Sequence, residues 1–591
     1  MGQIRVGLTF DDRVWSGDFC YSEFSNLDLQ LTEHRDGVRQ GRENEESLVV
    51  TASNVQENTE AANKPNDSPE CKNCSSVVRN KCTKATRRRY FKARVRAAVV
   101  EKKIFWADSI VPDIRRGLLR RGWTQKLSPT FSDNAMATLF SVPCRTDYYQ
   151  SRVHYNVQPN FVWTYDDISP RNLNNDQMLS DFMDHPCFVS KVGMCTSLKK
   201  LYRFAGADPY TFYPRCYVLE KREERQAFID DFRMTAARSI LKWVVRTNEP
   251  ETRRIYRGRN VVPEAVIWAA LVACKLHLNT LEHRDIDRLT KAKVAAHWKI
   301  LLRDYYQVMH HGAHIQNSQK YVEQCRRMLQ RLEPLMPQLN IDGEKNIWIL
   351  KPGYLSRGRG IHCRNRLDRI LRVAEPDFEW VAQKYIERPL LVYGTKIDLR
   401  QHFLITDWNP LTIWFYKDSF IRFSSQPFTV ECLDRSIHVC NNAIQRHLKN
   451  ASYRNPHLPE ENMWHSDEFQ YYLRSIGKEH VWDSIIIPGM KRALIHAVQV
   501  AQDTIRPRKN SFDLYGADFM FDKNFQPWLL EVNFKPDINK DTSVMTVLIP
   551  PMIESLLCVL IDRKTDPDCD VGGFELIYKQ TETETPKRTR R

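Results

Sequence analysis

Apolar residues recur at every fourth position in two long segments of the chain. Such spacing places the apolar side chains on one face of an α-helix. The first segment, 224–245, has this spacing at Phe228, Phe232, Ala236, Ile240 and Val244. The second begins at Met490, just after Pro488, which a first helical turn tolerates, and continues to Ile505. We predict two amphipathic helices whose apolar faces belong to the core.

Short apolar runs cluster after residue 345 and predict β-strands. They lie at 347–350, 400–406, 411–416, 517–521 and 528–533. Helical patterns dominate the middle of the chain before these runs. The combination predicts an α+β fold.

The last two of these strands predict a hairpin that brings two carboxylates together. A turn at 522–527 puts Asp518 opposite Glu531, with Asn533 farther along the same face. The same register pairs Phe519 with Leu530, Met520 with Leu529 and Phe521 with Trp528. Like charges directly opposite each other destabilise a sheet unless a cation lies between them, and two carboxylates with an amide suit Mg²⁺. An exposed hairpin whose carboxylates pair with lysines is the alternative, but the apolar flanks favour burial.

A segment rich in glycine and arginine follows the strand at 347–350. Lys351 offers a compact positive charge, Arg357 and Arg359 can bind anions with two N–H groups each, and the glycines around them let backbone N–H groups approach phosphate oxygens. The Gly-Lys-Ser/Thr order of a Walker loop is absent. The segment predicts a phosphate-binding loop, with a plain surface turn as the alternative.

The segment 396–400 alternates strictly between charged and apolar residues. On a strand, Lys396, Asp398 and Arg400 share one face while Ile397 and Leu399 pack behind it. An edge strand shows the same alternation, but the apolar stretch before this segment favours a face that contacts a ligand. The run 383–386 offers backbone groups to a purine.

Composition changes this picture mainly at the N-terminal side. The chain has 591 residues, enough for two to four domains, and a formal net charge of +16. Residues 81–126 hold 15 Lys or Arg against 3 Asp or Glu. Such a segment attracts a polyanion, which is nucleic acid, an acidic membrane surface or an acidic protein tail; a solvated basic face is the alternative. Residues 35–80 contain few large apolar side chains and predict disorder.

Targeting and metal signals are weak. No secretion signal opens the sequence, and the apolar run 265–274 is too short to cross a bilayer, which favours the cytosol or nucleus and reduced cysteines. Cys71, Cys74 and Cys82 offer three zinc ligands without a fourth. His310, His311 and His314 have helical spacing close to that of a zinc site but no acidic partner, which favours a polar helix face.

The motifs together resemble the tubulin–tyrosine-ligase-like family of ATP-grasp enzymes. Their order and spacing match the family in Lys351-Pro352-Gly353, the loop 357–360, Gln383-Lys384-Tyr385-Ile386, the segments 396–400 and 420–423, and Glu531-Val532-Asn533. The run 438–445 is similar to the family's His-Leu-Thr/Cys-Asn motif. Upstream, the segments 190–195 and 212–217 are similar to the tubulin glycylase branch. The resemblance covers roughly residues 90–565.

The resemblance implies ligation of glycine to the side-chain carboxylate of glutamates in tubulin C-terminal tails, through an acyl phosphate made with ATP and Mg²⁺. It assigns ATP to Lys351, Arg357, Gly358, Gln383, Lys384, Tyr385, Ile386, Lys396, Asp398, Cys440 and Asn441. It assigns Mg²⁺ to Asp518, Glu531 and Asn533. Contacts with phosphate or the acyl intermediate fall to the catalytic residues Arg400, Arg422 and Asn441.

The implied organisation is an ATP-grasp-like core with a basic, partly helical N-terminal extension. We expect a largely disordered region at 1–87, a basic module of the glycylase branch at 88–200, the catalytic region at 201–565 and a mobile basic tail at 566–591. The expected partners are tubulin, microtubules and free glycine. We expect a monomer without nucleic acid or membrane, in the cytoplasm and cytoskeleton, on microtubules of cilia or flagella.

Three alternatives and one departure from the family pattern stay open. A tubulin glutamylase shares the same motifs, and a catalytically weak microtubule-binding protein would use the basic segment alone. A nucleic-acid binder lacks any recognised reading motif. The family usually continues Asn-x-Ser-Pro after the metal-binding Glu, whereas this chain has Asn533-Phe534-Lys535-Pro536. If the serine position helps to hold the incoming amino acid, Lys535 would change which amino acid is used, change whether chains are elongated, or weaken catalysis.

Overall fold

A computed structural model describes most of the chain after residue 83. The described residues are 84–107, 111–126, 157–165, 174–182, 184–249, 260–283, 291–373 and 379–581. They fall within one compact unit, Cys82–Arg591. The predicted disorder at 35–80, the three cysteines at 71, 74 and 82 and residues 582–591 of the predicted tail lie outside the described residues. The prediction of a mobile tail from residue 566 is wrong for 566–581, because residues 574–579 form a paired strand of the central sheet. Helices and strands are both abundant, so the α+β prediction is confirmed.

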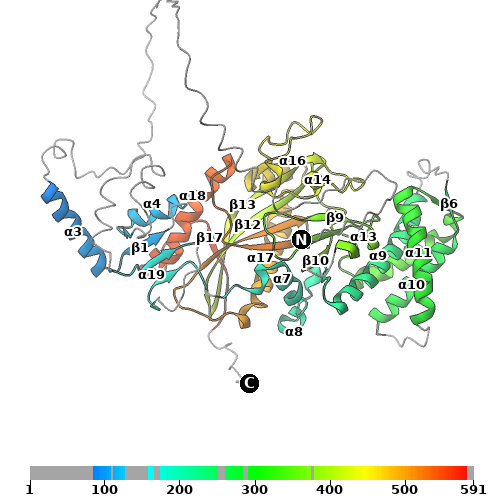
Figure 1. Ribbon diagram of the computed structural model, residues 1–591. Coiled ribbons are helices and arrows are strands. Elements are labelled where there is room, and N and C mark those ends of the chain that lie inside the picture. The colour runs from blue at the N-terminus through cyan, green and yellow to red at the C-terminus, as the bar shows by residue number, and fades with distance from the viewer. Residues whose placement is uncertain are drawn as a thin grey trace, which may run out of the picture. The chain divides into compact units, whose positions relative to one another are not determined.

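An antiparallel sheet runs through the centre of the unit (Figure 1). Its strand order is β14 (Met463–His465), β13 (Leu411–Pro427), β12 (Thr395–Trp408), β15 (Asp513–Phe521) and β16 (Pro527–Phe534). Two further strands join it, since β11 (Leu391–Val392) pairs with β12 and β17 (Phe574–Lys579) pairs with β13. Four of the five predicted strands therefore lie in one sheet, and β12 and β13 extend well beyond their predicted bounds.

A second, smaller antiparallel sheet carries the fifth predicted strand. Its order is β5 (Cys216–Val218), β10 (Trp380–Lys384), β8 (Trp348–Pro352) and β9 (His362–Arg364). The glycine- and arginine-rich segment connects β8 to β9. Its backbone is left-handed at Arg357, Gly358 and Gly360, with φ values of 58°, 74° and 70°, which glycine adopts without steric cost.

A third sheet belongs to the N-terminal side of the unit. Its order is β2 (Thr124–Gln125), β1 (Ile104–Ala107), β3 (Phe161–Trp163) and β4 (Met178–Leu179), and all its strands are parallel. Helix α3 (Lys84–Val100) precedes this sheet, and α4 (Pro112–Arg120) packs against α18 (Ser543–Leu557). The basic segment is thus partly helical, as predicted.

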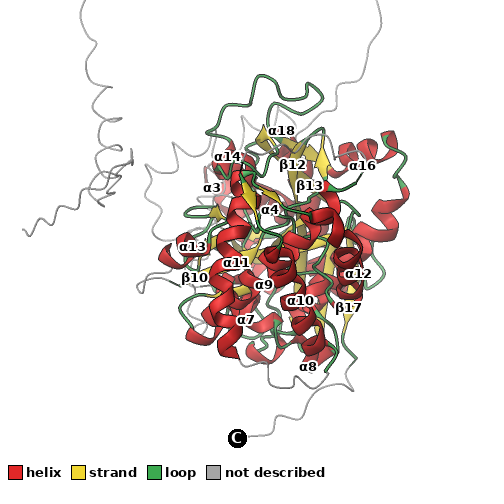
Figure 2. Cartoon of the chain, turned by 90° about the vertical axis from the view of Figure 1, so that its right-hand side faces the viewer, coloured by secondary structure: helices red, strands yellow, loops and turns green. Residues whose placement is uncertain are grey.

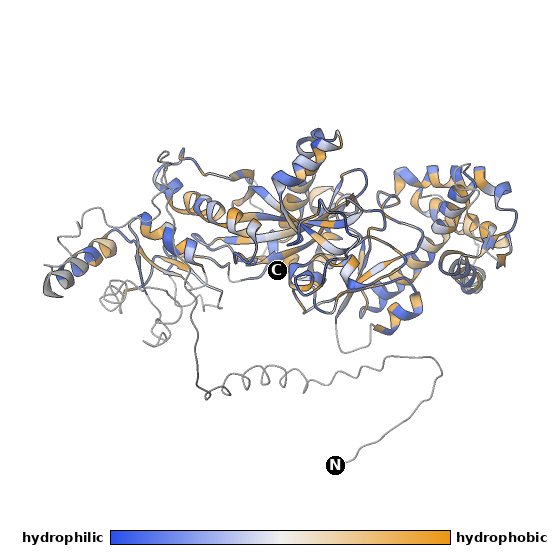
Figure 3. Cartoon of the chain, turned by 90° about the horizontal axis from the view of Figure 1, so that it is seen from above, coloured by the Kyte–Doolittle hydropathy of each residue, from blue (hydrophilic) through white to orange (hydrophobic). Residues whose placement is uncertain are grey.

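Four helices that contact one another lie beside the second sheet (Figures 1 and 2). They are α9 (Arg222–Thr247), α10 (Ala265–Leu281), α11 (Lys291–His311) and α12 (Val322–Leu332). The predicted helix at 224–245 is confirmed in α9, and its five apolar residues are all buried. Most helices in Figure 3 carry both orange and blue residues, as expected of helices with one buried face.

The second predicted helix is shorter than its apolar spacing indicated. Helix α17 (Ile487–Gln499) ends before Ala501 and Ile505, and a short 3₁₀ turn, Gln502–Thr504, follows it. Both residues are nevertheless buried. The spacing therefore predicted burial correctly and helix length wrongly, because a 3₁₀ turn keeps a similar apolar face.

Short helices and strands complete the described part of the unit. They are α7 (Lys191–Leu198), α8 (Leu201–Ala205), α13 (Leu367–Val373), α14 (Arg435–His438), α15 (Asn442–Gln445), α16 (Ser466–Ser475), α19 (Arg563–Thr565), β6 (Val261–Val262) and β7 (His314–Ile315). The segment Ser543–Thr565 is long and apolar enough to cross a membrane by length and composition alone. Most of its residues are buried against α4 and the central sheet, as in a core helix.

Candidate functional site

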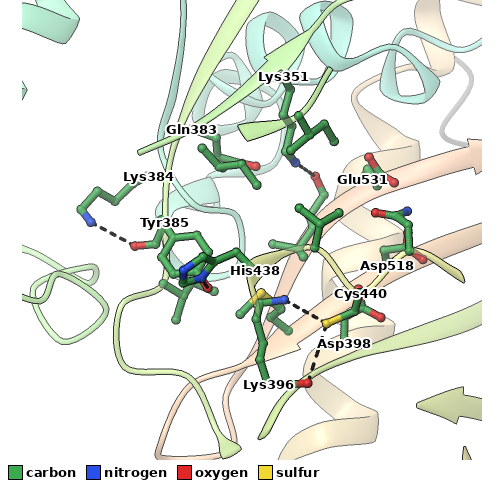
Figure 4. Close-up of a pocket in the computed structure, with 17 residues that line it drawn as sticks. Lys351, Gln383, Lys384, Tyr385, Lys396, Asp398, His438, Cys440, Asp518 and Glu531 are labelled. Carbon is green, nitrogen blue, oxygen red and sulfur yellow. Dashed lines mark hydrogen bonds between the residues drawn. The ribbon is translucent and has the colours of Figure 1, made fainter. Parts of the chain in front are cut away.

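A pocket lies where residues of the central sheet and the second sheet meet (Figure 4). Most of the predicted site residues line it: Lys351, Gln383, Lys384, Tyr385, Ile386, Lys396, Asp398, Cys440, Asn441, Asp518 and Glu531. The rest of its wall consists of residues to which the sequence assigned no role in the site: Ile349, Ile361, His438, Val439, Met520 and Leu530. The cavity is only about 50 Å³, well below the roughly 300–1,000 Å³ of ligand pockets. A nucleotide therefore requires these side chains to move apart.

The five other predicted residues lie around this pocket. Asn533 lines an adjoining pocket together with Lys351, Gln383 and Glu531. Arg400 and Arg422 stand behind Asp518, as described below. Arg357 lines an outer groove.

Gly358 touches the pocket through Asn441. A Cβ atom on Gly358 would lie 2.6 Å from Ile444 Cδ1 and 3.1 Å from Asn441 Oδ1. Only glycine therefore allows the loop to approach the start of α15 this closely.

The hairpin at the site carries a bulge that the sequence did not predict. Asp518 pairs with Glu531 as predicted, but Phe519 then faces Leu529 and Met520 faces Trp528. The predicted pairings beyond Asp518 are wrong by one residue, because Leu530 is an extra residue on β16. Bulges redirect side chains and are common beside active sites. Here the carbonyl oxygen of Leu530 accepts a hydrogen bond from Lys351 Nζ at 3.2 Å.

Two arginines hold the carboxylate of Asp518 in a buried charge network. Arg400 donates to both oxygens, with a distance of 3.1 Å from Nη2 to Oδ2, and Arg422 Nη2 lies 3.0 Å from the same Oδ2. Arg422 Nε also donates to Asp398 Oδ1 at 2.6 Å. Burial opposes ionisation of Asp518, but the two guanidinium groups hold the pKa of its carboxyl well below the usual range. Asp518 is therefore ionised throughout the physiological range.

Glu531 is the other carboxylate of the hairpin, and it makes no hydrogen bond or ion pair with any described residue. Asn533 Nδ2 lies 3.4 Å from Asp518 Oδ2, so the three predicted metal ligands converge. No group of three or more His, Cys, Asp or Glu side chains suited to a metal occurs in the described part of the chain. Two carboxylates and an amide nevertheless fit Mg²⁺, which usually takes one or two carboxylates together with phosphate oxygens and water.

Two ammonium groups enter the pocket without a carboxylate partner among the described residues. Lys351 is bonded to the bulge carbonyl, and Lys396 Nζ donates to Cys440 Sγ at 3.4 Å. Burial lowers the pKa of Lys351, while the charge of Glu531 acts against this effect. Burial also raises the pKa of the Cys440 thiol to about 11, so Cys440 stays neutral and serves as wall and acceptor.

Lys384 lines the pocket, but its ammonium group points away from it (Figure 4). Its Nζ donates to the carbonyl oxygens of Ile347 and Tyr385, both at 3.0 Å, and to Glu387 Oε1 at 2.7 Å. The backbone N–H of Ile386 makes no hydrogen bond within the described residues. The backbone N–H groups of Lys384 and Tyr385 are bonded to the carbonyl oxygens of Arg215 and Ile347. Within the run 383–386, the N–H of Ile386 is therefore the backbone donor left for a ligand, and the Lys384 side chain holds the backbone around it.

His438 fixes another part of the wall. Its Nδ1 lies 2.7 Å from the Tyr385 hydroxyl and its Nε2 lies 2.7 Å from the Cys432 carbonyl oxygen. Burial lowers the pKa of His438 to about 4, so the imidazole is neutral. The position of His438 in the His-Val-Cys-Asn run could have marked it as a site residue. Nothing in the sequence identified Tyr385 and Cys432 as its hydrogen-bond partners.

Lys535 turns away from the pocket. Strand β16 ends at Phe534, the backbone of Lys535 is left-handed with φ of 45°, and its Nζ lies 3.0 Å from Asp181 Oδ2. The ammonium group therefore joins the hairpin of β15 and β16 to the segment 174–182. This geometry gives no support to direct contact between Lys535 and an incoming amino acid.

The histidine cluster forms no metal site. His310 and His311 end α11, whereas His314 lies on β7. His310 packs against the rings of Tyr305 and Tyr306, and burial lowers its pKa to about 4. The predicted polar helix face is therefore wrong for His310, which belongs to a buried aromatic cluster.

Comparisons with known proteins match this geometry to one family. Residues 288–568 match the model of the tubulin-tyrosine ligase family. The chain is 40% identical to mouse (Mus musculus) tubulin monoglycylase TTLL3 over 85% of this chain and 61% of that protein. It is 41% identical to the human (Homo sapiens) protein of the same name over 85% of this chain and 68% of that protein. It is 32% identical to tubulin glycylase 3A of Drosophila melanogaster over 91% of this chain and 58% of that protein. The chain thus spans roughly three fifths to two thirds of the length of these relatives.

Proposed function

Because this chain belongs to the tubulin-tyrosine ligase family, we propose that it is a tubulin glycylase that uses ATP and Mg²⁺. It joins the amino group of glycine to the side-chain carboxylate of a glutamate in the acidic tail of tubulin. The names of its relatives, tubulin monoglycylase and tubulin glycylase, support this reaction over glutamylation.

The observation that carries the proposal is the set of charges without partners in one pocket. The ammonium groups of Lys351 and Lys396 and the carboxylate of Glu531 line it, and none forms an ion pair with a described residue. An anionic phosphate chain with a divalent cation complements such a set. A microtubule-binding protein without catalysis has no use for it.

The chemistry follows from these groups. A carboxylate is a poor electrophile, so the terminal phosphoryl group of ATP moves to the glutamate oxygen and leaves ADP. The glycine nitrogen then attacks the acyl carbon, a C–N bond forms, phosphate leaves and the nitrogen loses a proton. Lys351 and Lys396 would orient the phosphates, and Arg400 and Arg422, which are paired with Asp518, would stabilise the negative charge that develops.

The residues at the hairpin fit a bound magnesium ion. Asp518, Glu531 and Asn533 would hold it, and when bound it neutralises phosphate charge. The chain's own contribution is to keep Asp518 ionised through Arg400 and Arg422. The backbone of the run 383–386, held by Lys384 and His438, would receive the purine.

The first test is mass spectrometry of tubulin incubated with purified protein, Mg·ATP and isotopically labelled glycine or glutamate. Labelled glycine on tail glutamates is the expected result. Labelled glutamate instead would assign the protein to the glutamylases. Absence of both labels with tubulin still bound would favour the non-catalytic alternative.

The Glu531→Gln variant tests the metal assignment. It removes one negative charge without changing side-chain size, so we expect glycine ligation to fall at least about a hundredfold while the protein stays folded. Glu479→Gln, at an exposed glutamate elsewhere, is the matched control and should keep full activity. Normal ligation by a folded Glu531→Gln protein would refute the assignment.

The proposed function also includes the domain limits of the chain and its location in the cell. We assign 88–200 to a basic module, 201–565 to the catalytic region and microtubules of cilia or flagella to the cellular site. Fluorescence microscopy of the tagged protein in ciliated cells tests this location, and an even cytoplasmic signal would contradict it.

A further inference from the structure

Two open grooves lie near the pocket, one lined by the loop between β8 and β9 and the other by β9 and α13, and we call them the arginine grooves. The first has a cavity volume of about 570 Å³, and its lining includes Arg357, Arg359, Arg435, Arg446 and His447. The second has a cavity volume of about 700 Å³, and its lining includes Arg364, Arg369, Arg372 and Glu431. The segment 431–436 contributes to both grooves. The labels α14, β9 and α13 mark their neighbourhood in Figure 1.

The positive charge of the arginine grooves is not neutralised within the described residues. Six guanidinium groups there make no ion pair with a described carboxylate: those of Arg357, Arg359, Arg364, Arg369, Arg435 and Arg446. Seven arginines line the grooves against two acidic residues, Glu431 and Asp434, and Asp434 offsets part of the charge of Arg435. Asp434 Oδ1 accepts from the backbone N–H of Ser436 at 2.8 Å, and Glu431 Oε2 lies 2.8 Å from Lys345 Nζ.

Some arginines outside the grooves, in contrast, do form ion pairs with carboxylates. Arg121 pairs with Glu554 and Asp562, and Arg506 pairs with Asp184. Arg506 is largely exposed, with 68% of its side-chain surface accessible, so exposure alone does not leave an arginine without a carboxylate. The grooves are therefore a local concentration of guanidinium groups that are available to bind anions.

From this charge and its place beside the pocket, we propose that the arginine grooves bind an acidic peptide segment that flanks the reacting glutamate. The guanidinium group binds carboxylates with two parallel N–H donors. The first groove lies next to the pocket, because Arg435 Nη2 donates to the Gly358 carbonyl oxygen at 3.3 Å and Gly358 lies against Asn441. The segment 431–436 continues from there to the second groove. The inference rests on the proposed function and adds to it where the acceptor chain lies.

The lining favours a peptide over a nucleic acid. Proteins that bind single-stranded nucleic acid combine a basic groove with aromatic side chains on which bases stack. The residues that line the arginine grooves include no Phe, Tyr or Trp. Carboxylates along an extended peptide need only the guanidinium groups that are present.

The test uses direct binding, which does not depend on ligation. Two labelled acceptor peptides each carry one glutamate, flanked by aspartates in one and by asparagines in the other. Fluorescence anisotropy measures their binding to wild-type protein, to the groove variant with Arg369→Glu and Arg446→Glu, and to a control with Arg474→Glu and Arg492→Glu. All four arginines are exposed, and the control pair lies on α16 and α17, outside the grooves.

We expect wild type to bind the aspartate peptide on the order of tenfold more tightly than the asparagine peptide at low salt. The groove variant should lose this preference, and the control should keep it. Equal preference in the groove variant and wild type would overturn the inference, as would equal loss in the control. An RNA oligomer of equal charge that binds the grooves more tightly than the peptide would overturn it in favour of nucleic acid. A protein that binds the aspartate peptide through the grooves but attaches no glycine would refute the proposed function alone.

Discussion

Replacing Lys535 with methionine tests whether this residue holds the site together or handles the amino acid. The Lys535 ammonium group lies 3.0 Å from Asp181, and it joins the end of β16 to the segment 174–182. Methionine keeps most of the volume of the side chain and removes its charge. The carboxylate of Asp181 then stays behind without its partner.

The expected loss follows from the burial of this pair. The side chains of Lys535 and Asp181 are 14% and 12% exposed. Breaking a fully buried pair costs about 3–5 kcal/mol, and an exposed pair contributes about 0–1 kcal/mol. We therefore expect Lys535→Met to lower the free energy of unfolding by about 2–3 kcal/mol. A second change, Asp181→Asn, should recover part of this loss, with a coupling energy of about 1–2 kcal/mol.

Urea denaturation of the two single variants and the double variant measures this coupling. Lys523→Met, at an exposed lysine in the turn of the same hairpin, is the matched control and should change stability by less than about 0.5 kcal/mol. The same proteins are assayed for glycine ligation at varied glycine concentration. A changed KM for glycine in Lys535→Met, without loss of stability, would refute the structural role and return this lysine to amino-acid recognition.

Three further predictions concern other parts of the fold. Gly358→Ala should raise the KM for ATP on the order of tenfold because its Cβ meets Ile444 at 2.6 Å at a backbone φ of 74°; an ATP titration with an unchanged KM would contradict the fit. Asp342→Asn should lower the urea midpoint and cost about 3–5 kcal/mol, because Asp342 pairs with two buried arginines, whereas Asp230→Asn on the surface should have little effect. Burial raises the pKa of Asp513, with the nearby Asp181 adding to the effect. Its contribution to stability is therefore present below about pH 4 and lost as pH rises through the raised pKa, so wild type should lose more free energy of unfolding between pH 5 and 8 than Asp513→Asn.

Periodic patterns predicted the secondary structure and the faces of the site strands. The alternation at 396–400 put Ile397 and Leu399 in the core and Lys396 and Asp398 in the pocket, as the structure confirms. Period-two spacing constrains a strand because successive side chains must point to opposite faces. The same logic brought Asp518 and Glu531 together across the hairpin.

The bulge at Leu530 shows what such patterns leave open. One extra residue on β16 shifts every pairing beyond Asp518, yet it leaves the apolar residues of both strands buried or nearly so. Because burial is satisfied in either register, the apolar pattern does not distinguish them. The bulge is distinguished by its carbonyl bond to Lys351, a contact between segments far apart in the sequence.

The partners of charged side chains could not be predicted either, because they also come from segments far apart in the sequence. Lys384 and Lys535 both stand within family motifs, and both have ammonium groups directed away from the pocket, toward Glu387 and Asp181. A motif specifies a residue's position along a strand, whereas a long flexible side chain selects its partner from whatever the tertiary fold brings near. Buried ammonium groups need such partners, because an unpaired charge in the interior is costly. It follows that a ligand role for a motif lysine must be argued from where its nitrogen lies. By that criterion Lys351 and Lys396, whose ammonium groups enter the pocket, stay candidates for phosphate binding, whereas the Lys384 ammonium group is held by Glu387.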